Sequence, residues 1–252
     1  MIAFQNADEL DKMRRSGKIL GEILWELRRA VRPGLNLLEL DSMGEEMMVK
    51  RGARPAFKGY RGYKHSTCLS LNHEVVHGIP NDRELKEGDV LGIDVGIVID
   101  GFYADTAATV PVGEVHKRAQ KLLKTTEEAL QKGIAQARPG NHVGDIGFAV
   151  ESVAKRAGYG IVRDLFGHGI GRSLHQDPLI PNYGKTGEGI PLRVGMAIAI
   201  EPMFNLGGDE VETLPDGWTV VTKDSSLSAH FEHTLAITEN GPEVLTAMEA
   251  SV

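Results

Sequence analysis

The sequence has a single cysteine, Cys68, among 252 residues. One cysteine cannot form an intramolecular disulfide, so the chain does not need an oxidising compartment, and we expect a cytoplasmic location. No apolar run approaches the roughly 18 residues of a membrane-spanning helix, and the charged start of the chain is unlike a signal peptide, which excludes membrane insertion. The net charge of −7 provides no overall positive field, so we expect no specific nucleic-acid partner.

Two long amphipathic helices are predicted, and they repeat along the chain. Apolar residues recur at three- and four-residue steps over 7–31, where Asn6 and Glu9 have the spacing of a capping box. A second such helix is predicted over 115–137. Both helices end at the string RPG, 106 residues apart, and each is followed by a shorter helix that ends at a glycine, the first of them over about 38–51. This order predicts two similar halves.

The β-rich segments repeat as well. Residues 66–112 contain apolar runs broken by glycine and proline, and the end of one run at Asp94 recurs 107 residues later at Glu201. Chance similarity of short strings is the alternative, but the matches keep their order and nearly their register. We therefore predict an α+β fold with two halves related by a pseudo-two-fold axis. The predicted single domain is 1–252, with repeat units of approximately 7–112 and 115–245.

A hairpin is predicted to hold two aspartates on one face. Asp94 and Asp105 flank the Asp100-Gly101 pair, a strong signal for a two-residue turn. With that pair as the loop, position 94 faces 107 and position 96 faces 105, so the two carboxylates share one face at about 7–8 Å between backbones. A single strand aspartate is commonly a solvated edge residue. Two on one face of an apolar hairpin favour a functional pair.

Two more carboxylates are predicted to join this pair. Glu201 is the repeat equivalent of Asp94, and Glu232 is predicted to occupy the place of Asp105 in a second hairpin. At about 5 Å separation and a dielectric constant of ~20, each like-charge pair costs on the order of 3 kcal/mol. The neighbouring strands supply no lysine or arginine, whereas His168 enters from a glycine-flanked turn. Four carboxylates and one imidazole suit a pair of divalent ions of the manganese, iron or cobalt type.

Two further histidines are candidates for proton transfer or oxyanion stabilisation. His77 and His168 both stand in the string HGI, and His175 follows in the same glycine-rich segment. The other interpretation of each is a surface histidine or a hydrogen-bonded core histidine. We expect that simpler role for the remaining six, which are His65, His73, His116, His142, His230 and His233.

Several strings, in this order, resemble the motifs of the type I methionine aminopeptidases, and the similarity extends from about residue 5 to residue 245. They are NHEVVHGIP at 72–80, GIDVGIVIDGFYADT at 92–106, GHGIGRSLHQDP at 167–178, IEP at 200–202 and DGWTVVTKDSSLSAHFEHT at 216–234. The resemblance implies the pita-bread fold, in which two pseudosymmetric halves share a curved antiparallel sheet flanked by helices and form a single catalytic domain. The short spacings between His168, Glu201 and Glu232 are similar to type I rather than type II.

The resemblance also implies roles for individual residues. His175 would hold the oxyanion, His77 would contact the scissile amide, and Glu201 would shuttle the proton. The implied metal ligands are Asp94, Asp105, His168, Glu201 and Glu232. The implied walls of the methionine pocket are Phe57, Tyr60, Tyr63, Cys68, Leu174 and Trp218, together with His77 and His175. Bacterial members often have cysteine in place of Phe57 and phenylalanine in place of Leu174, and both replacements keep an apolar wall.

The implied activity is removal of the N-terminal methionine from nascent proteins and peptides when the second residue is small, by a hydroxide that bridges two divalent ions. Cobalt, manganese, iron and zinc are all candidates, because carboxylate and imidazole ligands accept several metals. The nearest alternative is an X-Pro aminopeptidase or prolidase, which usually carries a separate N-terminal domain, whereas here the repeat begins almost at the first residue. A non-catalytic pita-bread protein that binds RNA or protein is the other alternative, and the intact ligand set argues against it.

The partners implied by this activity are the N-termini of nascent polypeptides, with a transient contact to the ribosome. The sequence gives no indication of a further subunit, and we expect a monomer.

Overall fold

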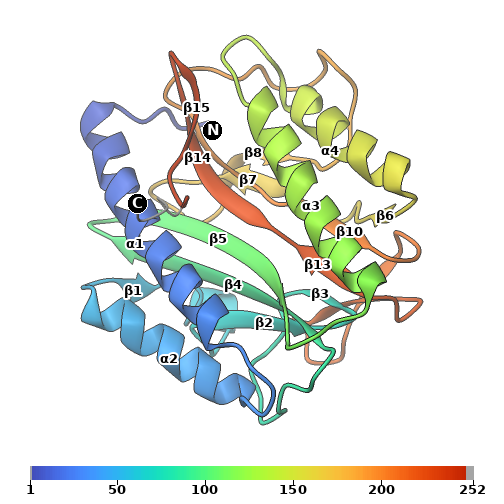
Figure 1. The fold of residues 1–252 in the computed structure, drawn as a ribbon. Helices are drawn as coiled ribbons and strands as arrows, with labels where there is room; N and C mark the ends of the chain where they lie inside the picture. The colour runs from blue at the N-terminus through green and yellow to red at the C-terminus, as the bar shows by residue number, and fades with distance from the viewer. Residues whose placement is uncertain (1, 248–252) are drawn as a thin grey trace.

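The computed structural model describes residues 2–247, which form four α-helices around one large antiparallel sheet (Figure 1). The helices are α1 (Ala7–Ala30), α2 (Leu37–Lys50), α3 (Lys117–Gln136) and α4 (Val143–Ala157), with a short 3-10 helix at Tyr60–Gly62. The strands are β1 (Arg54–Pro55), β2 (Thr67–Leu71), β3 (Glu74–Val76), β4 (Val90–Ile99), β5 (Phe102–Pro111), β6 (Gly160–Ile161), β7 (Gly167–Gly169), β8 (Gln176–Ile180), β9 (Ala197–Ile200), β10 (Met203–Asn205), β11 (Val211–Thr213), β12 (Val220–Thr222), β13 (Ser228–His230), β14 (Glu232–Thr238) and β15 (Gly241–Val244).

The first helix begins where its capping box predicts. The side chain of Asn6 accepts a hydrogen bond from the backbone N–H of Glu9, and the Glu9 carboxylate accepts one from the backbone N–H of Asn6. These two bonds satisfy donors that the first turn of a helix leaves free. The apolar stripe of α1, including Leu20, Ile23 and Leu27, is completely buried. The periodic pattern read from the sequence is therefore the core-facing side of this helix.

The helices recur at the spacing that the sequence indicates. The last residues of α1 and α3 are 106 positions apart, and so are the first residues of α2 and α4. The glycines that follow the two shorter helices, Gly52 and Gly158, both adopt the left-handed conformation at φ +73°. This conformation ends a helix by turning the chain away, and it is accessible to glycine without a steric cost.

Strands from both halves of the chain form a single nine-stranded sheet. Its strand order is β1-β4-β5-β14-β9-β7-β8, while β2 also pairs with β4 and β15 with β14. The strands before α3 meet the strands after α4 at the contact between β5 and β14. Two three-stranded sheets, β13-β10-β6 and β11-β12-β3, extend from the large one.

The hairpin of β4 and β5 has the predicted register. Asp100 and Gly101 form its loop at φ +51° and +80°, and Asp94 pairs with Ala107 while Gly96 pairs with Asp105. Successive residues of a strand point to opposite faces. Both aspartates therefore lie on the same face, as the turn signal predicts.

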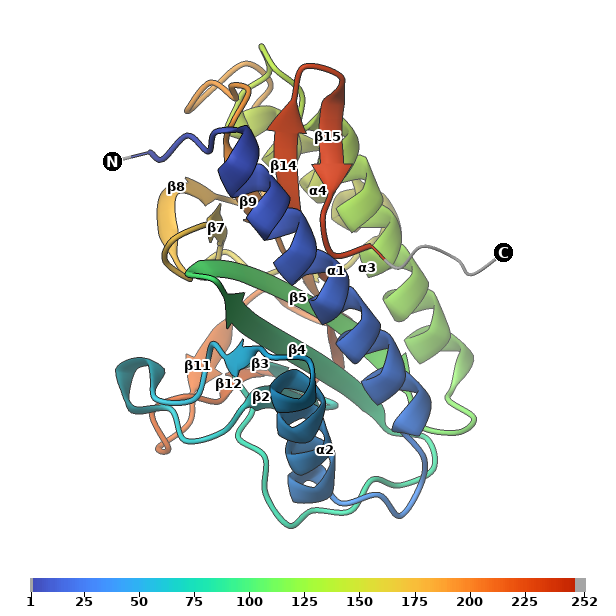
Figure 2. The same cartoon turned by 90° about the vertical axis from the view of Figure 1, so that its left-hand side faces the viewer.

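The helices cover one face of the large sheet. Figure 2 shows α1, α3 and α4 on the same side of the sheet, and the odd-numbered residues of β4, such as Ile93, Val95 and Ile97, lie fully buried in the core that these helices share. The even-numbered positions of β4, which include Asp94, point away from that core. This arrangement leaves the second face of the sheet for the polar site.

The prediction of a second hairpin is wrong. β9 and β14 pair antiparallel, but 31 residues separate them, and β10 to β13 lie within this connection. The last pair of this ladder is Ile200 with His233, so Glu201 follows this pair by one residue, directly after β9, and Glu232 precedes it by one residue on β14. Glu232 pairs with Ala107 on β5. It reaches the same cavity from the neighbouring strand.

None of the helices within residues 2–247 is both long enough and apolar enough to cross a membrane. The longest, α1, has 24 residues and carries charged side chains along its exposed face.

A substitution in α1 tests how closely the helix packs on the end of the chain. A Cβ atom at Gly17 would lie 2.5 Å from the carbonyl oxygen of Leu245, a distance that real Cβ contacts do not show. Alanine favours an exposed helix interior by roughly 1 kcal/mol over glycine. Because the clash outweighs this preference, we expect Gly17→Ala to lower the free energy of unfolding by about 1–3 kcal/mol, measured by urea denaturation. The exposed Lys18→Ala is the matched control, and a more stable Gly17→Ala variant would contradict this packing.

Candidate metal centre and substrate pocket

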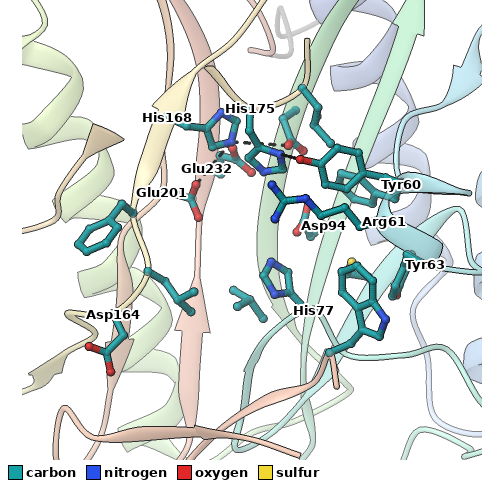
Figure 3. A pocket seen from close by; sticks show the side chains of 18 residues that line it. Tyr60, Arg61, Tyr63, His77, Asp94, Asp164, His168, His175, Glu201 and Glu232 are labelled. Atoms are coloured by element: carbon teal, nitrogen blue, oxygen red, sulfur yellow. Dashed lines mark hydrogen bonds and ion pairs between the residues drawn. The ribbon is translucent and has the colours of Figure 1, made fainter. Parts of the chain in front are cut away.

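A cavity of about 370 Å³ opens on the face of the sheet opposite the helices. All thirteen side chains singled out as site residues from the sequence line it, and Figure 3 shows histidines and carboxylates facing its interior. The structure therefore brings every predicted site residue together. Five further residues complete the lining, and these are Arg61, Val76, Asp164, Leu165 and Phe166.

Four carboxylates and one imidazole gather at the closed end of this cavity. Asp94 lies on β4, Asp105 on β5, Glu232 at the start of β14, His168 on β7 and Glu201 directly after β9. The His168 Nε2 atom is 4.0 Å from Asp105 Oδ2 and 3.7 Å from Glu201 Oε1. Ligand atoms of Asp105, His168 and Glu232 lie within 4.8 Å of one another. Residues from both halves of the chain thus meet within reach of one ion.

Burial makes the ionised form of these carboxyl groups unfavourable. It raises the pKa of Asp94 to about 7, and it raises the pKa of Asp105, Glu201 and Glu232 well above the ordinary range, with their mutual repulsion adding to the effect. An isolated cluster of this kind would retain protons at neutral pH. Ionisation of all four groups requires nearby positive charge.

Several polar atoms of the cluster have no hydrogen-bond partner within residues 2–247. They are Asp94 Oδ1, Asp105 Oδ1, Glu232 Oε1 and His230 Nε2. Buried polar atoms are almost always paired, because an unpaired one costs about 1–3 kcal/mol. Carboxylate oxygens with one imidazole nitrogen form a donor set typical of divalent manganese, iron, cobalt or zinc. The orphaned oxygens and the chemistry of the donors therefore fit a divalent metal centre.

His168 is oriented as a metal ligand. Its Nδ1 atom lies 2.9 Å from the carbonyl oxygen of Gly169, so Nδ1–H donates to that carbonyl and Nε2 carries the lone pair. Burial lowers the pKa of His168 to about 4, so the ring is neutral at pH 7. A neutral ring with its free Nε2 pointing at Asp105 and Glu201 is the form that binds a metal ion.

Threonine side chains fix the strands that carry the carboxylates. Thr234 Oγ1 accepts a hydrogen bond from the backbone N–H of Asp105 and donates one to its carbonyl oxygen, at 3.0 and 2.7 Å. Thr106 Oγ1 donates to the carbonyl oxygen of Glu232 at 2.7 Å. Only two residue pairs of β5 and β14 form a regular ladder. The hydroxyl groups thus extend the junction of the two halves across the site.

The two predicted catalytic histidines lie beside the carboxylates but outside the cluster. The His175 ring centroid is 4.3 Å from that of His168, and its Nδ1 atom is 2.9 Å from the hydroxyl oxygen of Tyr60. If Tyr60 donates this bond, Nε2–H of His175 is free to donate into the cavity. His77 has a left-handed backbone at φ +59° and faces the edge of Trp218. Burial is the largest cause that lowers the pKa of both histidines, His175 to about 3, so both are neutral donors or acceptors at pH 7.

The predicted methionine pocket forms the apolar side of the cavity. Its six members other than the two histidines belong to one apolar cluster, in which the Tyr63 and Trp218 rings meet edge to face at 5.0 Å. The Tyr63 hydroxyl donates to the carbonyl oxygens of Thr67 and Gly78, at 2.9 and 3.1 Å, which fixes that ring. The ring of Phe57 packs over Gly96, where a Cβ atom would come within 2.7 Å of it. The sequence prediction of an apolar wall next to the carboxylates agrees with this geometry.

Three polar residues of the site, His230, Arg61 and Asp164, were not found from the sequence. His230 was expected to be structural or on the surface, but it is buried, and its Nε2 atom lies 3.7 Å from Glu201 Oε2. Its position two residues before Glu232 was the available signal. The strands next to the carboxylates supply no lysine or arginine. Arg61 nevertheless lines the cavity, because it lies in the turn at Tyr60–Gly62 and not on a strand. The glycines on either side of the Tyr60-Arg61 pair were the only indication of that turn.

Comparison with known proteins agrees with this site. The model of metallopeptidase family M24 matches residues 11–239. A methionine aminopeptidase of Clostridium perfringens is 49% identical over 249 residues, which cover 99% of this chain and all of that protein. The crystal structure of methionine aminopeptidase from Rickettsia prowazekii superposes with a TM-score of 0.96 at 42% identity, over 98% of this chain and all of that one.

A more distant structure shares the fold alone. The prolidase of Pyrococcus furiosus superposes with a TM-score of 0.80 at 24% identity, over 98% of this chain and 66% of that chain. The predicted α+β pita-bread fold is thereby confirmed, while the X-Pro alternative is not favoured. The full-length identity to methionine aminopeptidases and the acidic centre lead to one assignment: this chain belongs to metallopeptidase family M24 and, within it, to the methionine aminopeptidases.

Proposed function

We propose that this chain removes the N-terminal methionine from peptides and nascent proteins whose second residue is small. The observation that carries the proposal is the position of the buried acidic centre directly beside an apolar pocket with ordered aromatic walls. A pocket of this kind holds a linear, polarisable thioether side chain by contact alone. The first peptide bond of the substrate would then lie over the carboxylates.

The proposal includes two divalent ions held by Asp94, Asp105, His168, Glu201 and Glu232. Two ions of charge +2 balance four ionised carboxylates, whereas one ion leaves two negative charges uncompensated in a buried site. When bound, such ions act as Lewis acids that make water a nucleophile at neutral pH. Cobalt, manganese, iron and zinc all suit these ligands, so availability in the cell decides which metal is used.

The remaining steps belong to side chains of the pocket. Glu201 is the proton shuttle, because its carboxyl lies between the His168 and His230 rings and can accept a proton from water and deliver it to the leaving amine. His175 stabilises the oxyanion through Nε2–H, in the tautomer that a hydrogen bond from Tyr60 would select. His77 contacts the scissile amide from the opposite wall. Tyr63, Cys68, Leu174 and Trp218 enclose the methionine side chain.

The cellular setting completes the proposal. We infer that the whole chain acts as one catalytic domain and as a monomer, because ligands from both halves of the same chain close the site. Its substrates are nascent chains in the cytoplasm, met through transient contact with the ribosome. Gel filtration and co-sedimentation with ribosomes test these two statements separately.

The first prediction from the proposed function concerns the pH dependence of the metal-free protein. In the unfolded state these carboxyl groups ionise at about pH 4, whereas in the folded state their raised pKa values keep them protonated. Their contribution to stability is therefore complete below about pH 4 and decreases as the pH rises toward the folded-state pKa, which is about 7 for Asp94. We expect the free energy of unfolding in a chelator to fall by at least about 1 kcal/mol between pH 5 and 8. Denaturant titrations across this range measure it.

Two comparisons accompany that measurement. Asp94→Asn should flatten the pH dependence, because it removes one raised carboxyl group. Added Mn²⁺ should reverse the trend, because the ionised carboxylates bind the metal and only the folded state holds the site. If the free energy of unfolding of the metal-free protein instead rises steadily from pH 5 to 8, these carboxyl groups do not have raised pKa values.

The second prediction separates His175 from the metal ligands. We expect His175→Ala to lower kcat by at least about 100-fold while the metal content of the protein stays unchanged, because the ring donates to the oxyanion and binds no ion. Tyr60→Phe, which removes only the hydroxyl that orients the ring, should cost about three- to tenfold. Steady-state kinetics and elemental analysis of the same samples give both quantities. Loss of metal from His175→Ala would place this residue among the ligands instead.

The third prediction tests the proposed function on a peptide panel. Met-Ala-Ser and Met-Gly-Ser should be cleaved, whereas Met-Phe-Ser and Met-Lys-Ser should remain nearly intact, because large second residues do not fit beside the acidic centre. A norleucine peptide should be cleaved more slowly than its methionine counterpart, since small apolar differences cost about 1–3 kcal/mol. N-acetyl-Met-Ala-Ser should be inert, because the acylated nitrogen offers neither a cation nor a basic lone pair to the centre. Preferred cleavage of Ala-Pro peptides would favour an X-Pro peptidase.

A further inference from the structure

Arg61 places a guanidinium group in the substrate pocket, and no step proposed above uses it. The residue lines the cavity together with the metal-centre carboxylates and the methionine walls. Figure 3 shows its side chain reaching from the loop beside Tyr60 toward the interior, while Asp164 stands at the far side. The carboxylates of the cluster lie deeper than Arg61, which is itself exposed to solvent. Its charge therefore belongs to the mouth of the pocket.

The backbone holds Arg61 in an unusual conformation. Its φ of +47° and ψ of +27° are left-handed, in a turn between Gly59 and Gly62, which have φ values near +90°. A left-handed conformation is disfavoured for an arginine and is without cost for glycine. The turn is closed by hydrogen bonds from the Gly59 N–H to the Tyr63 carbonyl oxygen at 2.8 Å and from the Tyr63 N–H to the Tyr60 carbonyl oxygen at 2.9 Å. An arginine in this disfavoured backbone conformation indicates a functional role rather than a structural one.

The same loop is anchored to helix α2. Asp41 accepts hydrogen bonds from the backbone N–H groups of Ser66 and Thr67 and from the Thr67 hydroxyl, at 3.0, 2.8 and 2.8 Å. These bonds fix the end of the loop from which β2 begins. The hydrogen-bonded turn thus fixes the backbone of Arg61, and the guanidinium can reach only a limited part of the pocket mouth.

Arg61 has no acidic partner of its own. Among residues 2–247, no carboxylate forms an ion pair with it, and its guanidinium lies over the ring of Tyr60, whose centroid is 5.4 Å from Cζ. Its charge contributes to the lowered pKa of His175, after burial and the two neighbouring histidines. A guanidinium carries five N–H donors, and it matches a carboxylate geometrically. The donors of Arg61 are available to a bound molecule.

The path of the substrate determines which of its residues reaches Arg61. In the proposed function, the methionine side chain fills the apolar pocket and the first peptide bond lies at His175. The ring of His175 is hydrogen-bonded to Tyr60, the sequence neighbour of Arg61. The second residue has a small side chain and offers no charged group. The chain beyond it leaves through the mouth, where Arg61 stands. The third residue is the first that can present a side-chain carboxylate there.

We infer that Arg61 determines specificity beyond the second residue, by binding the side-chain carboxylate of an acidic third residue of the substrate. The inference rests on the proposed function and extends it. Arg61 contributes to peptide binding and takes no part in hydrolysis. Its effect therefore falls on KM and leaves kcat nearly unchanged.

The test compares amidated peptides, which removes the terminal carboxylate as a source of negative charge. The wild-type enzyme loaded with Mn²⁺ should cleave Met-Ala-Asp-Gly-NH₂ with a kcat/KM about two- to fivefold above that of Met-Ala-Asn-Gly-NH₂, the range of an exposed ion pair. The difference should lie in KM and decrease with added salt. In Arg61→Asn, whose new side chain tolerates the left-handed backbone, the ratio should fall to about one, while turnover of the asparagine peptide stays within about twofold. Arg61→Lys should keep part of the preference.

Lys64→Gln is the matched control, because it removes one positive charge from the same loop at a residue outside the cavity lining. It should preserve the preference for aspartate. Equal ratios in wild type and Arg61→Asn, or an equal loss in Lys64→Gln, would overturn the inference while leaving the proposed function intact. An equal preference for aspartate at the fourth residue, in Met-Ala-Gly-Asp-NH₂ against Met-Ala-Gly-Asn-NH₂, would also overturn it. No cleavage of the asparagine peptide by wild type would refute the proposed function and this inference with it.

Discussion

Repulsion among buried carboxylates is the constraint on which this structure depends. Asp94, Asp105, Glu201 and Glu232 share one cavity, and at a separation of about 5 Å each ionised pair costs on the order of 3 kcal/mol. Burial raises the pKa of all four groups, and repulsion adds to this effect for Asp105, Glu201 and Glu232. Asp94, Asp105 and Glu232 carry oxygen atoms without hydrogen-bond partners among the described residues. Binding of a cation offsets the free-energy cost of burying and ionising these four groups. The acidic cluster thus destabilises the metal-free protein and binds metal ions strongly for the same reason.

The sheet is arranged so that this cluster forms only in the complete fold. Asp94 and Asp105 come from a local hairpin, but His168, Glu201 and Glu232 belong to strands of the second half. The two sets meet at the short ladder between β5 and β14, which threonine hydroxyls extend. Folding and metal binding are consequently linked, because the unfolded chain has no preformed site. The apolar pocket beside the ligands adds substrate selection to the same junction.

The sequence predicts most where local rules apply. The Asp100-Gly101 turn is sufficient to place Asp94 and Asp105 on one face, because the register of a two-residue hairpin follows from its loop. The second hairpin, which was expected to carry Glu232, was wrongly predicted, since pairing across a 31-residue connection depends on tertiary packing and not on turn chemistry. Arg61 was not found at all, because its approach to the cavity depends on a loop conformation. The walls of the methionine pocket followed from family resemblance rather than from periodicity.

The most direct test of this account is the stoichiometry of metal binding. Calorimetric titration of the metal-free protein with Mn²⁺ at neutral pH, checked by elemental analysis after gel filtration, measures the number of ions per chain. We expect two ions per wild-type chain and at most one in Glu232→Gln, with the far-ultraviolet circular dichroism of the variant unchanged. Absence of binding to the folded wild-type protein, or full binding by the variant, would contradict the claim that this carboxylate cluster is a metal centre.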